Sequence, residues 1–118
     1  MKNILLVEDE AITALSLKLG LEKRGYAVEN PVATGEAAIK NIEDSPPDAI
    51  IMDIRLAGPL DGIETAKIIL GKYSIPIIFT SGYNDVTILE RIKNLETEAY
   101  LHKPVSVNDI CDVLDRIF

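Results

Sequence analysis

Three short apolar runs limit the folds open to this chain more than any other feature. Residues 4–7 (ILLV), 49–52 (AIIM) and 75–79 (IPIIF) are almost continuously hydrophobic, and Gly, Pro, Asn or Asp residues bound the segments that contain them. A strand that faces water on one side alternates apolar and polar residues, whereas a strand buried on both faces reads as a continuous apolar run. The pattern therefore indicates a parallel sheet with helices above and below it.

Five strands and five helices are expected to alternate along the chain. Asp61 and Glu64 have the spacing of a capping box, and Ser106 with Asp109 is a weaker version of the same helix start. Within the first helical segment, Ile12, Leu15 and Leu19 recur at helical spacing. The expected strands are 3–8, 27–33, 48–53, 75–80 and 98–103, and the expected helices are 10–24, 34–43, 61–72, 84–94 and 106–117.

Five βα units in 118 residues predict a doubly wound, flavodoxin-like α/β fold. Each crossover between parallel strands is right-handed and places its helix on one face of the sheet or the other. We expect residues 1–118 to form a single domain, because no linker, repeat or low-complexity tract interrupts them.

Composition narrows the function classes. With 19 acidic and 12 basic residues the net charge is −7, which argues against direct binding of nucleic acid by this chain. The single cysteine, Cys111, cannot form an internal disulfide and is expected to be inert. The first apolar run is too short for a signal peptide or a membrane span, so we expect a cytoplasmic location with no membrane contact.

Polar residues stand where four of the strands end. They are Glu8 and Asp9 after the first strand, Asp53 on the third, Thr80 on the fourth and Lys103 on the fifth. Each has an ordinary structural explanation. Acidic side chains interact favourably with the positive end of a following helix, threonine is common in strands, and lysine is common at the surface. Ligands of such sheets bind outside the carboxyl ends of the strands, so together these residues predict a site.

The charges of these residues suggest the chemistry. Three carboxylates at one edge repel one another, and a hard divalent cation such as Mg²⁺ relieves that repulsion. One carboxylate is then available to attack phosphorus, while Lys103 pairs with a phosphoryl oxygen and Thr80 donates a hydrogen bond to one. Phosphoryl transfer needs mainly such positioning and charge stabilisation.

At this point the sequence resembles the receiver domains of two-component response regulators along essentially its whole length. The motifs that carry the resemblance are LLVEDE, IIMDIRL, DGIETA, IIFTSG and AYLHKP, in that order. The resemblance implies the strand order 2-1-3-4-5. It also implies a signalling switch that promotes no reaction beyond its own aspartyl phosphorylation and dephosphorylation.

The resemblance further implies a role for each site residue. Asp53 would accept a phosphoryl group from a phosphohistidine on a partner histidine kinase or phosphotransfer protein. The implied ligands of Mg²⁺ (or Mn²⁺) are Asp9, Asp53 and the backbone carbonyl of Arg55, with Glu8 helping directly or through water. Thr80 and Lys103 would contact the phosphoryl group.

The route by which the signal leaves the domain is implied as well. Tyr100 would move with Thr80 and change the surface formed by residues 84–94, the fifth strand and the last helix, which is then the expected face for a downstream protein or a homodimer. Lys103–Pro104 resembles the cis peptide of the family. His102, the only histidine, is expected to be a packing or surface residue.

Two departures from the family pattern concern the loop after Asp53. The stretch DIRLAGPLDG has one more residue than the commonest pattern and carries Ala57 where many members have proline, so a different loop shape is expected. Arg55 replaces a smaller polar residue, which places a cation either over the phosphoryl group or beside Glu8.

Other functions fit the residues less well. A flavin-binding electron carrier needs a loop rich in Ser, Thr and Gly after the first strand, where this chain has Glu8, Asp9 and Glu10. A phosphatase with an aspartate nucleophile carries that residue on the first strand in a different motif. An interaction module that is never phosphorylated has no need of the intact set of Asp9, Asp53, Thr80 and Lys103. Whether the domain stands alone or belongs to a longer protein stays open.

Overall fold

A five-stranded parallel sheet organises the chain, as the sequence predicts. The computed structural model describes residues 1–82 and 86–118, and the strand order is β2-β1-β3-β4-β5. The strands are β1 (Asn3–Val7), β2 (Ala27–Val28), β3 (Ala49–Asp53), β4 (Ile77–Ser81) and β5 (Ala99–His102). The helices are α1 (Ala11–Lys23), α2 (Gly35–Asp44), α3 (Gly62–Leu70), α4 (Val86–Ile92) and α5 (Val107–Ile117).

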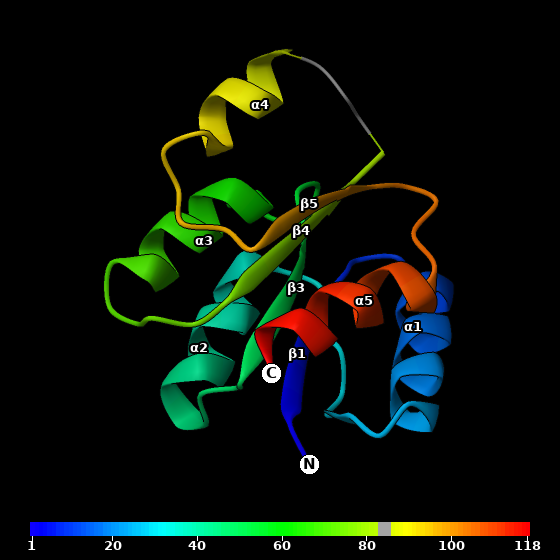
Figure 1. The fold of residues 1–118 in the computed structure, drawn as a ribbon. Helices are drawn as coiled ribbons and strands as arrows, with labels where there is room; N and C mark the ends of the chain where they lie inside the picture. Colours follow the sequence, from blue (N-terminus) through cyan, green and yellow to red (C-terminus); the bar gives the residue numbers. More distant parts are fainter. Residues whose placement is uncertain (83–85) are drawn as a thin grey trace.

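Helices cover both faces of the sheet (Figure 1). Side chains of β1 alternate between the two layers: Leu5 and Val7 join the core under α2, α3 and α4, whereas Ile4 and Leu6 join the core under α1 and α5. Both sets are almost fully buried. The continuous apolar runs therefore have the predicted cause, since Ile4–Val7 of β1 and all residues of β3 and β4 are buried. Within the described residues, no helix is long and apolar enough to cross a membrane.

The second strand is shorter than predicted. Regular pairing with β1 covers only Ala27 and Val28, and Val32 then pairs with Val7 as an isolated bridge. Pro31 lies between these two pairings and has no N–H to donate to a strand ladder. The expected strand over 27–33 is therefore an interrupted edge, although Val32 still accepts a hydrogen bond from the Glu8 N–H at 2.9 Å.

The apolar residues that suggested the first helix do not face the core. Ile12, Leu15 and Leu19 are 86%, 56% and 52% exposed, and the buried residues of α1 are Ala14, Leu17 and Leu21. Both sets have helical spacing, so spacing alone does not choose the buried side. The buried stripe packs in one core cluster with residues of the sheet and of α5.

The predicted helix starts at Asp61 and Ser106 are confirmed. Both are N-caps in complete capping boxes, with Glu64 and Asp109 as the reciprocal partners. Each box satisfies two backbone N–H groups that a helix start leaves without an intrahelical partner.

The first residue of α3 fixes this helix against the end of β3. The Gly62 N–H donates to the Ile54 carbonyl at 2.7 Å, and a Cβ atom at Gly62 would collide with the Asp53 carbonyl oxygen and the Ile54 Cα. Glycine is required here for close backbone approach, not for an unusual φ angle. Asp53 is thereby held at a defined height above the sheet edge.

We expect Gly62→Ala to lower the free energy of unfolding by at least about 2 kcal/mol, because the methyl group overpacks against backbone that cannot move aside. Urea denaturation measures the loss. Gly71→Ala is the matched control, since its Cβ would meet only ordinary contacts at 3.4 Å and its φ is −69°. Equal stability of the two variants would contradict this account of the α3 start.

Candidate functional site

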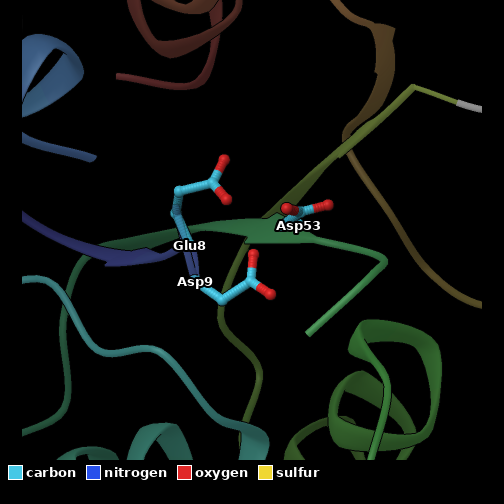
Figure 2. Close-up of side chains that lie close together, drawn as sticks. All are labelled: Glu8, Asp9 and Asp53. Carbon is cyan, nitrogen blue, oxygen red and sulfur yellow. The ribbon is translucent and has the colours of Figure 1, made fainter. Parts of the chain in front are cut away.

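The polar residues that end the strands gather at one edge of the sheet. Asp53 is in register with Thr80 on β4, and Val7 at the end of β1 is in register with Met52 just before Asp53. Glu8 and Asp9 follow β1 directly and so reach the same edge. Figure 2 shows the side chains of Glu8, Asp9 and Asp53 close together around the ends of β1 and β3.

Three carboxylates form the centre of the site. One oxygen of each of Glu8, Asp9 and Asp53 lies within 4.8 Å of those of the other two. Glu8 and Asp53 are 4% and 3% exposed, whereas Asp9 is exposed. Negative charges this close repel one another strongly when water is excluded, so the site favours a cation.

Lys103 supplies one positive charge to this cluster. Its Nζ donates to Glu8 Oε1 at 3.1 Å and to Asp53 Oδ2 at 3.0 Å. The Lys103 N–H bonds the Ser81 carbonyl at 2.7 Å, which fixes the residue beside β4, and the Lys103–Pro104 peptide is cis as predicted. One ammonium thus bridges two buried carboxylates that lie 95 and 50 residues away in the sequence.

Burial and charge shift the pKa values of the site in opposing ways. Burial, and then the Asp53 carboxylate, raise the pKa of Glu8. The pKa of Asp9 is raised as well, first by partial burial of its carboxyl and then by Glu8. Burial by itself would lower the pKa of Lys103, but its hydrogen bonds to Asp53 and Glu8 outweigh that and raise it. Lys103 therefore stays charged, and its ammonium group donates hydrogen bonds to both Glu8 and Asp53.

The second oxygen of Asp53 points to the start of the β3–α3 loop (residues 54–61). Asp53 Oδ1 accepts the Arg55 N–H at 3.1 Å, which orients the carboxylate. Glu8 forms an ion pair with Lys103. The Arg55 side chain is among those that line a groove between this loop and α4. The Arg55 carbonyl stays a predicted metal ligand.

The remaining predicted residues lie around this centre. Thr80 is 4% exposed beside Asp53, and Tyr100, in register with Phe79, is half-buried against the core under α2, α3 and α4. Of the predicted surface 84–94, residues 84 and 85 lie outside the described residues, and α4 spans 86–92. His102 is exposed and Cys111 is buried, which agrees with their expected structural roles.

The altered loop after Asp53 has its own anchor. Ala57 pairs with Thr34 as an isolated parallel bridge, and Gly58 follows with φ of +89°, a conformation that favours glycine. The Thr34 side chain also caps α2 by accepting the Ala37 N–H. The extra loop residue is therefore accommodated by attachment to the start of α2.

A groove of about 620 Å³ opens onto the site between α1 and the segment after β5. Sequence reasoning missed it, because it is formed by residues from both ends of the chain. Its lining residues are Glu8, Glu10, Ile12, Thr13, Ser16, Leu17, Thr80, Lys103, Pro104 and Val105.

A protein-family model described as the response regulator receiver domain matches residues 4–115. The chain belongs to this family. The resemblance inferred from the motifs is thereby confirmed, and the domain is a signalling domain of two-component systems.

Relatives of this receiver domain include transcriptional regulators and solved receiver structures. The transcriptional regulatory protein PdtaR of Mycobacterium tuberculosis is 30% identical over 97% of this chain and 55% of its own length. PhoP, the alkaline phosphatase synthesis transcriptional regulatory protein of Bacillus subtilis, is 34% identical over 92% of this chain and 45% of its own length. The chain thus spans about half the length of these relatives.

Solved structures agree with the fold. The signal receiver domain of a modulated diguanylate cyclase from Desulfovibrio desulfuricans G20 has a TM-score of 0.91 at 34% identity, covering 98% of this chain and 92% of the other. A CheY-like receiver domain protein from Methanospirillum hungatei JF-1 has a TM-score of 0.89 at 28% identity, covering 99% and 93%.

Repulsion within the acidic cluster predicts that Asp9→Asn stabilises this receiver domain. Because the pKa of Asp9 is raised on folding, the folded state loses stability as the pH rises above the unfolded-state value of about 3.9. In the absence of divalent cations at pH 7, the substitution should raise the free energy of unfolding by a few tenths of a kcal/mol up to about 1 kcal/mol, since Asp9 is exposed to solvent. The gain should shrink as the pH falls toward 4.

Urea denaturation at pH 7 and pH 5 measures this effect. Glu43→Gln, which removes one exposed negative charge from α2, is the control for net charge. An equal gain in both variants would mean that overall charge, and not the cluster, limits stability.

Proposed function

We propose that Asp53 accepts a phosphoryl group from a phosphohistidine of a partner histidine kinase or phosphotransfer protein. The contact of Lys103 Nζ with both Asp53 and Glu8 is the observation that carries this proposal. It keeps a nucleophilic carboxylate and a cation together at the sheet edge, next to a groove open to solvent. Within the family found here, these are the parts that phosphoryl transfer to aspartate requires.

The residues divide the chemistry between them. A carboxylate oxygen of Asp53 forms the new P–O bond as the donor's P–N bond breaks, and the imidazole is the leaving group. Lys103 pairs with a phosphoryl oxygen, and the Thr80 hydroxyl donates to another. Lys103 already contacts Asp53 and Thr80 is in register with it, so both groups lie near the reacting carboxylate before the phosphoryl group arrives.

The acidic cluster fits Mg²⁺ or Mn²⁺. All of its donors are hard oxygens, and the two buried carboxylates, Glu8 and Asp53, share the ammonium group of Lys103. We propose that Asp9, Asp53 and the Arg55 carbonyl hold the ion, with Glu8 contributing directly or through water. When bound, it supplies positive charge that offsets the repulsion between Asp53 and an incoming phosphoryl group.

The output is proposed to run through Tyr100. Its ring packs against the core layer that also includes α4, so a shift of Thr80 toward the phosphoryl group changes the space available to the ring. The surface of α4, β5 and α5 is the proposed face for a downstream protein or a second copy of the chain. The domain itself is proposed to be cytoplasmic and to bind no nucleic acid directly, in line with its net charge of −7.

The donor is proposed to dock over α1. The groove that Ile12 lines also includes Thr80 and Lys103, the residues proposed to contact the phosphoryl group. The exposed apolar stripe of Ile12, Leu15 and Leu19 continues from there along the helix. Apolar residues gathered on one exposed helix face are typical of an interaction surface. A helix-bearing phosphodonor that covers α1 satisfies both features.

Acetyl phosphate with a divalent cation should add one phosphoryl group, located on Asp53 by mass spectrometry. The product should be acid-stable and labile to base and hydroxylamine, because acyl phosphates are attacked readily at carbon. Asp53→Asn should abolish the modification, and Asp9→Ala should slow it by at least roughly tenfold through loss of a metal ligand. A phosphoryl group on Thr80 or Ser81 would show the assignment to be wrong.

Docking over α1 predicts that Ile12→Ser lowers phosphotransfer from a protein donor but not from acetyl phosphate. Purified histidine kinase cores of the source genome, phosphorylated with ATP, serve as donors. Loss of one apolar contact at a binding surface typically costs roughly five- to tenfold. Ile68→Ser on α3, which removes an apolar residue that is 42% exposed, should transfer at the rate of the unaltered protein.

A further inference from the structure

One ion pair joins α4 to the loop that follows Asp53. Arg91 of α4 contacts Asp61 Oδ2 at 2.7 Å, and the two side chains are 36% and 28% exposed. Asp61 is the last residue of the β3–α3 loop and the N-cap of α3. The two residues are 30 positions apart in the sequence. The loop follows β3, which carries Asp53, and α4 follows β4, which carries Thr80.

Asp61 is tied closely to the strand that carries Asp53. Its other carboxylate oxygen accepts the Glu64 N–H at 2.8 Å, and its own N–H donates to Glu64 Oε1 at 3.0 Å. The next residue, Gly62, bonds the Ile54 carbonyl at 2.7 Å. The Asp61 carboxylate is therefore connected to the backbone beside Asp53 through short hydrogen bonds.

Helix α4, in contrast, is anchored by few contacts. Among its described side chains only Ile92 is buried, at 8% exposure, while Ile88 is partly buried against the core and Leu89 is 44% exposed. A groove of about 400 Å³, lined in part by Ile54, Thr87 and Arg91, separates the helix from the β3–α3 loop. Figure 1 shows α4 at the margin of the fold, beyond α3. One ion pair can therefore influence the position of this helix.

We propose that the Arg91–Asp61 pair couples the position of α4 to the β3–α3 loop, with Arg91 acting as a positioning residue that favours the α4 arrangement of the unphosphorylated protein. Coupling of this kind is reciprocal: a change at either end alters the other. Its use in signalling rests on the proposed phosphorylation of Asp53, but the coupling itself is a property of the unmodified chain.

The alternative is an ordinary surface ion pair with local effects only. Such pairs contribute about 0–1 kcal/mol and leave distant backbone unchanged. The two accounts differ in what each substitution does to the opposite element. Arg91→Gln should disturb the β3–α3 loop, and Asp61→Asn should disturb α4, only if the pair couples the two.

Hydrogen exchange of the unphosphorylated protein tests this coupling. Arg91→Gln, Asp61→Asn and the double variant are compared with the unaltered chain, and asparagine retains the N-cap function of Asp61. Lys93→Gln is the control. Lys93 directly follows α4, and among the described residues its ion pair is with Glu90 at 3.7 Å, between two largely exposed side chains. Amides of α4 and of residues 54–61 are followed separately.

The coupling predicts roughly two- to fivefold faster exchange of the loop in Arg91→Gln and of α4 in Asp61→Asn, the range that a partly exposed ion pair supplies. The double variant should match the single variants, because the interaction can be lost only once. Three results would overturn the proposal. They are faster exchange confined to the substituted element, additive effects in the double variant, and an equal response to Lys93→Gln.

Magnesium beryllofluoride, an acyl-phosphate mimic, tests the link to the switch. If the pair favours the unphosphorylated arrangement, Arg91→Gln should bind the mimic up to roughly fivefold more tightly than the unaltered protein. Equal affinity would overturn the part of the proposal that concerns signalling. Absence of binding in every protein would instead count against Asp53 as the phosphoryl acceptor, while the exchange data still decide the coupling.

Discussion

The contact of one ammonium with two buried carboxylates is the interaction on which the rest of this site depends. Lys103 Nζ lies 3.1 Å from Glu8 and 3.0 Å from Asp53, both of which are almost fully buried. Without that cation, two charges would be buried with no compensation, which is strongly destabilising. With it, a third carboxylate at Asp9 still leaves the cluster with excess negative charge. The Lys103 contacts therefore compensate the burial of Glu8 and Asp53, and the remaining negative charge favours binding of a further cation.

The sheet supplies the rigidity that such a cluster requires. Strands β1, β3 and β4 are buried on both faces, so their carboxyl ends are held in fixed register. Gly62 lets α3 start directly against the Asp53 backbone, where a side chain would collide. The free-energy cost of the repulsion between carboxylates at this edge is thus offset by burial of apolar side chains in the core. Functional sites are commonly supported by a stable core in this way.

Elements around the site differ in how firmly they are held. The start of α3 is fixed by a capping box and a backbone bond to Ile54. Among the described side chains of α4, Ile88 and Ile92 pack against the core and Arg91 forms the ion pair with Asp61. Under the proposed coupling, a change at Asp53 would be transmitted to a rigid neighbour, the start of α3, and expressed as movement of the less firmly held α4. Switching elements are drawn from the least stable parts of a fold for this reason.

The sequence by itself determined the fold class and the central acids, because continuous apolar runs have few alternatives to a covered parallel sheet and because polar residues that end parallel strands must meet at one edge. Tertiary structure decided what periodicity leaves open. Two stripes of α1 have helical spacing, and packing against the sheet and α5 buried Leu17 and left Ile12 exposed. The edge strand ended at Val28 because Pro31 interrupts its pairing. The Arg91–Asp61 contact had no signal in the sequence, since an ion pair between distant segments exists only once the chain has folded.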